Sequence, residues 1–187
     1  MSISNILRHC SHIVFSGILF TQFSCGQTPS KQPASNPTAT PASADASYKA
    51  EHEGWLVDIE EAYALSEKTN KPILANFTGS DWCIWCKRLA AAVFVHDEFK
   101  NWAKNNVILL ELDFPRGKTI PAKIQQQNNN LQQVLQVQGF PTVWLFDLNK
   151  NPTTNQFNIQ TLGMTGYTAT PSEFISKINE YIKQRKK

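Results

Sequence analysis

The stretch that decides the fold of this chain is Trp82-Cys83-Ile84-Trp85-Cys86, in which two cysteines lie two residues apart. The apolar segment before it, Ile73–Phe77, predicts a buried strand, and residues 87–94 after it predict a helix. A Cys-x-x-Cys pair between a strand and a helix is typical of a redox-active dithiol. The helix N-terminus favours a thiolate on Cys83, and Cys86, one turn along, is close enough to attack a mixed disulfide on it.

The composition of the 187 residues fits one domain with additional segments. The net charge of +3 is small, and basic residues gather between 183 and 187. We interpret these as the solvated end of a helix and expect no nucleic-acid binding. Two of the four cysteines, Cys10 and Cys25, lie in the N-terminal part, which leaves a single pair in the predicted domain. This is not the dense cysteine pattern of a disulfide scaffold, and it suits one functional dithiol.

The N-terminal segment has the pattern of a secretory signal peptide, which we assign to residues 1–24. Arg8 precedes a short apolar run over residues 13–20, and this run is shorter than the roughly 20 residues of a transmembrane helix. Residues 25–47 are rich in Pro, Ala, Ser and Thr and have no apolar periodicity. Such a segment cannot bury enough surface to fold, so it predicts a disordered tether. The domain then occupies residues 48–187.

Cys25 stands where the signal peptide and the tether meet, in a setting that resembles a bacterial lipoprotein cleavage site. Ser24 fits such a site, whereas Gln22 and Phe23 replace the usual Leu and small residue. Two outcomes stay open: lipidation of Cys25 at the new N-terminus, or ordinary cleavage to a soluble form. Both place the domain in the periplasm, with any membrane contact made only through the lipid.

Capping residues mark the helix starts of the domain. Asp58, with Glu61 three residues on, predicts an N-cap and its capping-box partner, and the helix then runs to residue 69. Asp97 predicts the N-cap of a later helix. Thr170 followed by proline predicts the start of the last helix.

The remaining segments alternate between strand and helix patterns. The apolar run at residues 107–112 predicts a strand buried on both faces. The Gln- and Asn-rich connection 113–139 is interpreted as a polar-faced helix, because its apolar residues recur near helical spacing: Ile124, Leu131, Val134 and Leu135. Strands are expected at 143–146 and, as an antiparallel edge, at 157–162, ending at Gly163. This alternation predicts a mainly parallel sheet finished by a hairpin.

The chain resembles the thioredoxin superfamily in two motifs: Trp82-Cys83-x-x-Cys86 after a buried strand, and Phe140-Pro141-Thr142 before a later one. Three further segments resemble periplasmic members of that superfamily: Lys71-Pro72-Ile73, Gly79–Cys83 and Phe114–Lys118. The resemblance implies a thioredoxin-like α/β fold, with a central mixed sheet flanked by helices. It also implies a helical insertion before the cis-proline strand, and a cis Pro141 packed beside the dithiol.

Two positions depart from thioredoxin, in which a buried carboxylate on the strand before the dithiol aids proton transfer from the resolving cysteine. The matching position here is Asn76, and a lysine of the neighbouring strand is also missing, with Leu109 or Leu110 near its place. Glu111 is the one acid within the run 107–112 and could substitute for that carboxylate. The alternative that we favour is that Glu111 reaches solvent at the strand end. Asn76 and Glu111 are the candidates for proton transfer.

The dithiol and the resemblance together imply a disulfide reductase. Cys83 would attack a partner disulfide beside Pro141, and Cys86 would resolve the mixed disulfide. The predicted substrate-binding residues are Trp82, Trp85, Phe140 and Thr142. The residues between the cysteines, Ile84 and Trp85, bring no charged side chain to the thiolate, which favours a reducing poise.

The resemblance implies that such a reductase, in an oxidising periplasm, takes electrons from a membrane carrier of the DsbD type and acts on disulfide-bonded periplasmic clients. We expect a monomer with no cofactor beyond its own redox pair. The alternatives within the fold are a dithiol oxidase or isomerase and a reductant for cytochrome c maturation. A zinc site needs about four ligands, whereas the domain has no second Cys pair and His52 and His96 lack ligand spacing. No metal is therefore expected, and a binding module with a vestigial pair is the last alternative.

Overall fold

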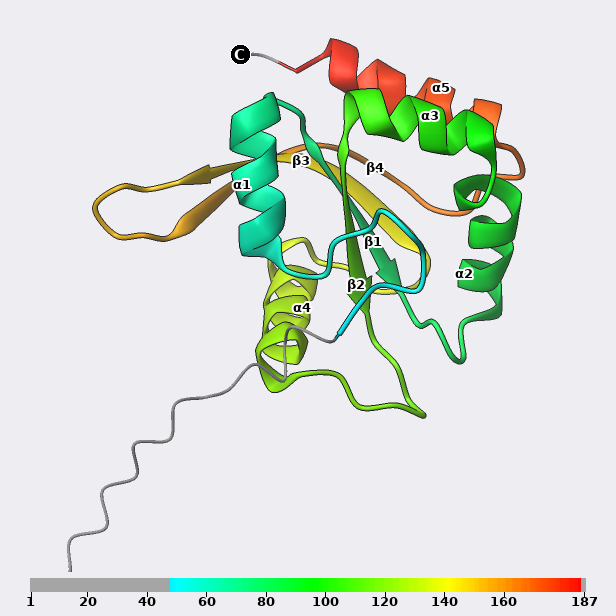
Figure 1. The fold of residues 1–187 in the computed structure, drawn as a ribbon, viewed down its shortest axis with the longest axis horizontal. Coiled ribbons are helices and arrows are strands. Elements are labelled where there is room, and N and C mark those ends of the chain that lie inside the picture. Colours follow the sequence, from blue (N-terminus) through cyan, green and yellow to red (C-terminus); the bar gives the residue numbers. More distant parts are fainter. Residues whose placement is uncertain (1–47, 186–187) are drawn as a thin grey trace, which may run out of the picture. The chain divides into compact units, whose positions relative to one another are not determined.

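The computed structural model describes residues 48–185, and the predicted signal peptide, tether and Cys25 lie outside this range. Figure 1 shows one sheet between two groups of helices. The helices are α1 (Ile59–Thr69), α2 (Ile84–Leu89), the π-helical turn η2 (Ala90–Phe94), α3 (Asp97–Asn106), α4 (Ala122–Val134) and α5 (Pro171–Lys183). The strands are β1 (Ile73–Thr78), β2 (Ile108–Asp113), β3 (Thr142–Lys150) and β4 (Phe157–Thr165). The sequence predicted these elements in this order. None of the helices in residues 48–185 is both long and apolar enough to cross a membrane.

The sheet has the strand order β2-β1-β3-β4 and is mixed, as the resemblance implied. Only β1 and β2 are parallel, while β3 runs antiparallel to both β1 and β4. The expectation of a mainly parallel sheet was therefore wrong. The connection through α4 returns to the end of the sheet that it left, since Thr78 pairs with Asp113 and the next residue back, Phe77, pairs with Thr142. A crossover that returns to its starting end must produce an antiparallel strand.

Strand β1 is buried on both faces, and its side chains alternate between two apolar cores. Leu74 lies in the core formed with η2, α3 and α5, together with Phe94, Phe99 and Phe174. Ile73, Ala75 and Phe77 lie in the second core, with residues of α1 and α4. The alternation places Asn76 on the same face as Leu74, toward the helices that follow the dithiol.

Two of the three predicted N-caps are confirmed. Asp58 accepts a hydrogen bond from the N–H of Glu60 (2.8 Å), and Thr170 accepts one from the N–H of Glu173 (3.2 Å). The prediction for Asp97 was wrong, because His96 occupies the cap position and Asp97 is the first residue of α3. An acid in the first turn is favoured by the helix dipole, so the sequence signal was real but lay one residue late.

Gly163 does not end β4, contrary to the prediction. The strand continues to Thr165, with a register irregularity opposite Leu145 and Phe146. A Cβ atom on Gly163 would lie 2.5 Å from the ring of Tyr181. The glycine therefore marks the place where α5 packs closely against the sheet.

Helix α4 is the predicted insertion, and three of its four predicted apolar residues are buried: Ile124, Leu131 and Leu135. Val134 is 65% exposed, so its placement on the buried face was wrong. A polar residue, Asn128, lies in the interior instead and donates a hydrogen bond to the carbonyl of Asp113 (2.9 Å). Helical spacing alone could not reveal this exchange of a polar for an apolar position.

Candidate active site

Three loops meet at one end of the sheet, and the candidate active site lies there. The dithiol loop follows β1, the loop 114–121 follows β2, and residues 139–141 lead into β3. The pairings of Thr78 with Asp113 and of Phe77 with Thr142 bring the three loops together. In Figure 1 this region lies beside the start of α2.

Cys83 and Cys86 form a disulfide, so the structure describes the oxidised state. Cys83 is the N-cap of α2, and its sulfur accepts a hydrogen bond from the N–H of Cys86 (3.2 Å). Both cysteines are only 5% exposed. The geometry confirms that the first sulfur lies at a helix start, where N–H groups stabilise a thiolate.

Trp82 lies over Gly79 and forms one wall of the site. A Cβ atom on Gly79 would lie 2.4 Å from the indole ring, so only glycine permits this arrangement. The indole N–H donates to the carbonyl of Phe114 (2.8 Å), and the guanidinium carbon of Arg116 lies 3.8 Å from the ring centroid. Trp82 remains 37% exposed, which fits a surface that meets a partner.

Trp85 lies in the first turn of α2, between the two cysteines, and is 48% exposed. Its ring meets Tyr167 edge to face, with 5.2 Å between centroids. The guanidinium carbon of Arg88 lies 4.6 Å from the Trp85 ring centroid. Tyr167 was not predicted as a site residue, because it lies 82 residues from Trp85 in a segment without a motif.

The loop 114–118 is tied to the dithiol loop by Asp81. The carboxylate of Asp81 accepts hydrogen bonds from the N–H groups of Arg116 and Gly117. These bonds, led by that from Gly117, hold the pKa of Asp81 below its ordinary value. The segment singled out by its resemblance therefore forms part of the site.

Phe140 and Pro141 bring the third loop to the site, and the bond between them is cis, as the resemblance implied. The ring of Phe140 lies 5.9 Å from that of Trp82 and stacks on Phe114 at 5.1 Å. The hydroxyl of Thr142 donates to the carbonyl of Gly139 (2.8 Å), which braces the loop. The structure therefore brings Phe140 into contact with Trp82, while the roles of the predicted substrate-binding residues remain predictions.

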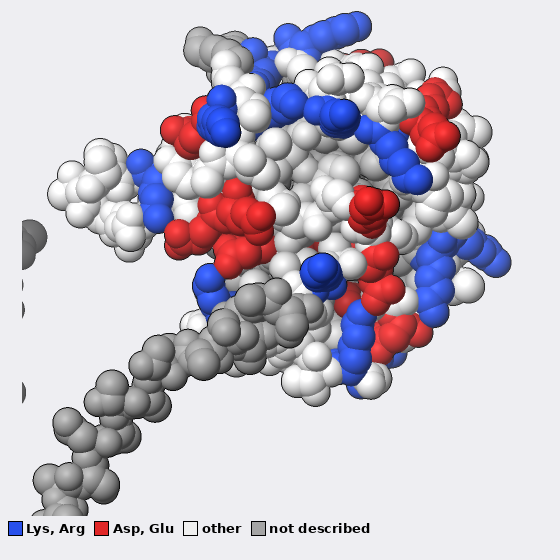
Figure 2. All heavy atoms as spheres, in the orientation of Figure 1, with Lys and Arg blue, Asp and Glu red and all other residues white. Residues whose placement is uncertain are grey.

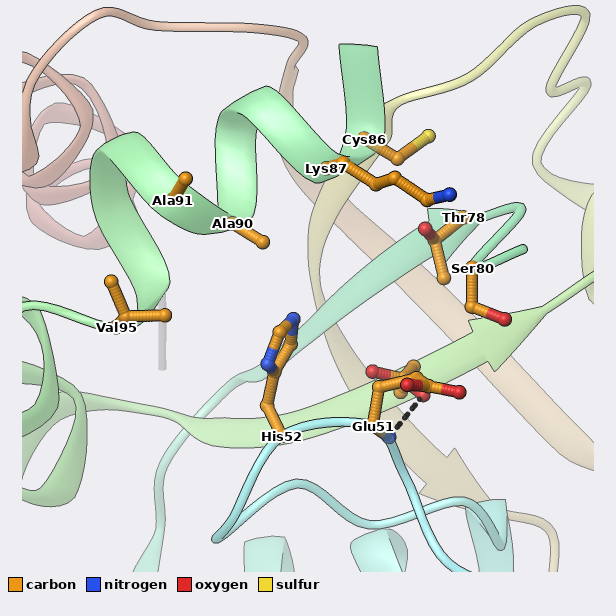
Figure 3. A pocket seen from close by; sticks show the side chains of 10 residues that line it. Glu51, His52, Thr78, Ser80, Cys86, Lys87, Ala90, Ala91 and Val95 are labelled. Atoms are coloured by element: carbon orange, nitrogen blue, oxygen red, sulfur yellow. Dashed lines mark hydrogen bonds between the residues drawn. The ribbon is translucent and has the colours of Figure 1, made fainter. Parts of the chain in front are cut away.

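A cavity of about 340 Å³ lies on the inner side of Cys86. Its wall includes Thr78, Glu111 and, from the segment just before α1, Glu51 and His52. Figure 3 shows Glu51 and His52 facing the helix that carries Cys86, Lys87 and Ala90 across this space. The cavity gives Cys86 a polar side away from the aromatic walls.

Glu111 is 2% exposed, so the expectation that it reaches solvent was wrong. Its carboxylate accepts a hydrogen bond from the N–H of Glu51 (2.9 Å), drawn as the dashed line in Figure 3. Burial, opposed in part by this bond, raises the pKa of Glu111 from 4.5 to about 7. A neighbouring backbone causes the burial: Leu56 bridges to β2 outside its free edge, with the N–H of Glu111 donating to the carbonyl of Leu56 (2.8 Å).

Asn76 and Glu111 are register partners on the parallel strands β1 and β2, so they lie side by side on one face. Asn76 is buried, and within residues 48–185 its side-chain oxygen has no hydrogen-bond partner. An amide at this position cannot accept a proton from a thiol at neutral pH, whereas the adjacent carboxylate can. Of the two candidates, only Glu111 has a group that can take a proton, and its role in proton transfer remains a prediction.

A second buried carboxylate, Asp113, anchors the dithiol loop. It accepts hydrogen bonds from the N–H and the hydroxyl of Ser80 (2.9 and 2.7 Å), and Lys118 lies 3.2 Å away. Lys118 also pairs with Glu51, and these carboxylates raise its pKa despite partial burial. Four residues of the site were not predicted from the sequence, because each has a partner more than 30 positions away: Asp81, Asp113, Arg116 and Glu51. No group of three His, Cys, Asp or Glu side chains in the described part of the chain is placed to hold a metal ion.

Comparison with known families defines the class. Residues 59–181, which include the dithiol and the cis-proline, match the family described as Thioredoxin-like domain. The chain belongs to this family, and the fold described above is the fold that the resemblance implied.

Two known proteins and one solved structure are similar to this chain. Disulfide bond reductase DsbH of Chlamydia pneumoniae is 37% identical over 87 residues, which are 46% of this chain and 52% of DsbH. Thiol:disulfide interchange protein DsbD of Vibrio vulnificus is 31% identical over 98 residues, which are 52% of this chain and 15% of DsbD. The chain thus spans about half the length of DsbH and a smaller part of DsbD. A solved structure of a DsbH oxidoreductase has a TM-score of 0.59 and 30% identity, covering 70% of this chain and 85% of the other.

Proposed function

We propose that this protein is a thiol-disulfide oxidoreductase that works as a protein-disulfide reductase. The observation that carries the proposal is the Cys83–Cys86 disulfide at the start of α2, between two exposed tryptophan walls and a buried carboxylate. The names of the relatives, a disulfide bond reductase and a thiol:disulfide interchange protein, support it.

The reaction starts from the reduced protein. The Cys83 thiolate attacks one sulfur of a partner disulfide, so a Cys83–partner bond forms while the partner bond breaks and its leaving thiolate takes a proton. The Cys86 thiolate then attacks Cys83, which releases the second partner sulfur. Two electrons pass to the partner, and the protein is left with the disulfide seen in the structure.

Glu111 is the proposed proton acceptor for Cys86. Both line the same cavity, and the pKa of Glu111 near 7 allows the carboxylate to accept a proton at neutral pH and release it again. Asn76, beside it on β1, would orient the site and take no proton.

The partner would dock on the exposed aromatic surface. Trp82, Trp85 and Phe140 supply apolar area, while Pro141 and Thr142 shape the loop that faces the mixed disulfide. Clients are disulfide-bonded proteins of the periplasm, and we propose that the protein is monomeric there, either soluble or tethered through a lipid on Cys25.

The direction of electron flow follows from the residues between the cysteines. Ile84 and Trp85 place no charged group in the motif, so the thiolate is less stabilised than in a strong oxidant. The protein would then be reduced by a dithiol carrier of the membrane, of the DsbD type.

The proposal is tested by the equilibrium potential of the Cys83–Cys86 pair in glutathione buffers, together with insulin reduction. A potential near the roughly −270 mV of thioredoxin is expected, with catalysed precipitation of insulin. A potential near the roughly −120 mV of DsbA would refute the reductase direction. Cys86→Ser should trap clients as mixed disulfides on Cys83, and no trapped species in periplasmic extracts would contradict the proposed location.

A further inference from the structure

Both tryptophans of the Trp82–Cys86 motif have a guanidinium group stacked on the ring. Arg116 covers Trp82, the residue before Cys83, at 3.8 Å, and Arg88 covers Trp85, between the two cysteines, at 4.6 Å. Stacking engages the flat face of a guanidinium and leaves the N–H groups along its edge available to an acceptor.

The edges of the two stacked arginines have no acceptor in the described part of the chain. Within residues 48–185 neither side chain donates a hydrogen bond or forms an ion pair. Arg185 behaves differently, since it binds the carboxylate of Asp147 and the carbonyl of Asn70. The two stacked arginines therefore have N–H groups that can bind an acceptor on another molecule.

The acids near the site are already occupied. The carboxylate of Asp81 accepts hydrogen bonds from the N–H groups of Arg116 and Gly117. Asp113 is buried, where it binds Ser80 and Lys118. Figure 2 shows a separate group of exposed acids over α1. The docking surface therefore presents two tryptophan rings, each with a stacked arginine that has no acidic partner within residues 48–185.

Arg116 is positioned in advance. Its backbone is held by Asp81, and the ring beneath it is held by the hydrogen bond from Trp82 to Phe114. An arginine with a fixed ring and a fixed backbone loses little further freedom when it binds a carboxylate, which favours specific recognition.

We propose that this site selects polypeptide partners whose disulfide cysteine is flanked by acidic residues. The inference rests on the proposed reductase function and adds a substrate class to it. A carboxylate on each side of the partner cysteine would meet Arg88 and Arg116 while the partner sulfur reaches Cys83. The partner disulfide is reduced by the two electrons of the dithiol, in the steps given above.

The test uses three peptides that are identical except for the residues before and after one cysteine, which are both Glu, both Gln or both Lys. Each peptide is a disulfide-linked dimer, and its reduction by the fully reduced protein is followed under single-turnover conditions. The expected order of rate constants is Glu, then Gln, then Lys, with about a tenfold span at about 10 mM salt. The span should shrink at about 0.5 M salt, because the arginines are exposed to solvent.

Arg116→Gln and Arg88→Gln identify the groups that read the charge. Arg116→Gln keeps the backbone N–H that binds Asp81, so the loop is retained. Each variant should lower the Glu-to-Lys ratio, and the double variant should bring it close to one. Lys177→Gln on α5 removes the same charge far from the site and should leave the ratio unchanged.

Two results would overturn the inference. One is an unchanged Glu-to-Lys ratio in the double variant. The other is an equal fall for all three peptides, which would mean that the arginines act on the sulfur and do not read the partner. Failure of wild-type protein to reduce any peptide or insulin would refute the proposed function itself, and this inference with it.

Discussion

The two sides of the Cys83–Cys86 pair differ in secondary structure and in burial. The outer side consists of loops and the first turns of α2, and it exposes the rings of Trp82 and Trp85, which are stacked under arginines. The inner side consists of strands and the segment that covers them, and its central group, Glu111, is almost fully buried. The outer side can change its chemistry with single loop residues, whereas the inner side depends on the packing of the sheet.

This difference separates two tasks. In the proposed mechanism the outer side meets the partner, so substitutions there should change which disulfides are reduced. The inner side lies beside Cys86, so substitutions there should change how the rate depends on pH. A substitution on one side that alters the property assigned to the other would show that the two sides do not work separately.

The largest effect is expected where the two sides meet, at the sulfurs. Cys83→Ser should abolish insulin reduction, because the attacking thiolate is removed. Cys86→Ser should retain the first step and accumulate a mixed disulfide, measured by mass spectrometry after an acid quench. Equal trapping by the Cys83→Ser variant would contradict the order of attack that places the partner on the outer side.

Removal of the inner carboxylate should have the next largest effect on the rate. Glu111→Gln keeps the size and an acceptor for the N–H of Glu51 but cannot take a proton. The resolving step of wild-type protein should accelerate as pH rises through about 7, the pKa of Glu111, and this inflection should vanish in the variant. The rate at pH 8 should fall about a hundredfold.

The same variant should be more stable than wild type at high pH. A carboxyl group whose pKa is raised from 4.5 to about 7 on folding binds its proton more tightly in the folded state. The contribution of Glu111 to the free energy of unfolding is therefore complete below pH 4.5. It falls by about 3 kcal/mol as the pH rises through about 7. Denaturant unfolding of the oxidised proteins at pH 4 and pH 8 measures the difference. Glu61→Gln on the exposed face of α1 is the control and should show no such gain.

Glu111 also shows what sequence patterns could reveal. Its position in a strand was predicted correctly, and so were the dithiol, the cis-proline loop and the order of elements. Its burial was not, because β2 is an edge strand and the covering residue, Leu56, belongs to no recognisable motif. Strand patterns report which face a residue lies on, but they carry no information about what covers an edge.

The arginines of the outer side were missed for a related reason. Arg116 reaches Trp82 only because Asp81 binds the loop 114–118, a contact between residues 35 positions apart. The resemblance singled out that loop but did not indicate that it binds Asp81. Local patterns predicted the elements and the redox pair, while the positions of Arg116 and Glu111 depend on contacts between residues far apart in the sequence.

A smaller effect, confined to the outer side, is expected from Gly79→Ala. The added methyl group would lie 2.4 Å from the Trp82 ring and force it out of place, at a cost of about 1–3 kcal/mol in unfolding free energy. Displacement of the ring should slow insulin reduction several-fold while the pH inflection of the resolving step stays near 7. Gly139→Ala, where the added methyl group has no atom within 4 Å, is the matched control. A shifted inflection in Gly79→Ala would show that the two sides are not independent.

The smallest effect is expected from Glu51→Ala, which tests what tunes the inner side. The side chain of Glu51 pairs with Lys118, but both groups are exposed, so its loss should cost less than about 1 kcal/mol. The hydrogen bond to Glu111 comes from the backbone N–H of Glu51 and is retained in the variant. Removal of a nearby negative charge should therefore lower the pKa of Glu111 only slightly, measured as the pH inflection of the resolving step. A return of that inflection to near 4.5 would mean that the pKa of Glu111 is raised by the charge of Glu51 and not by burial under the segment just before α1.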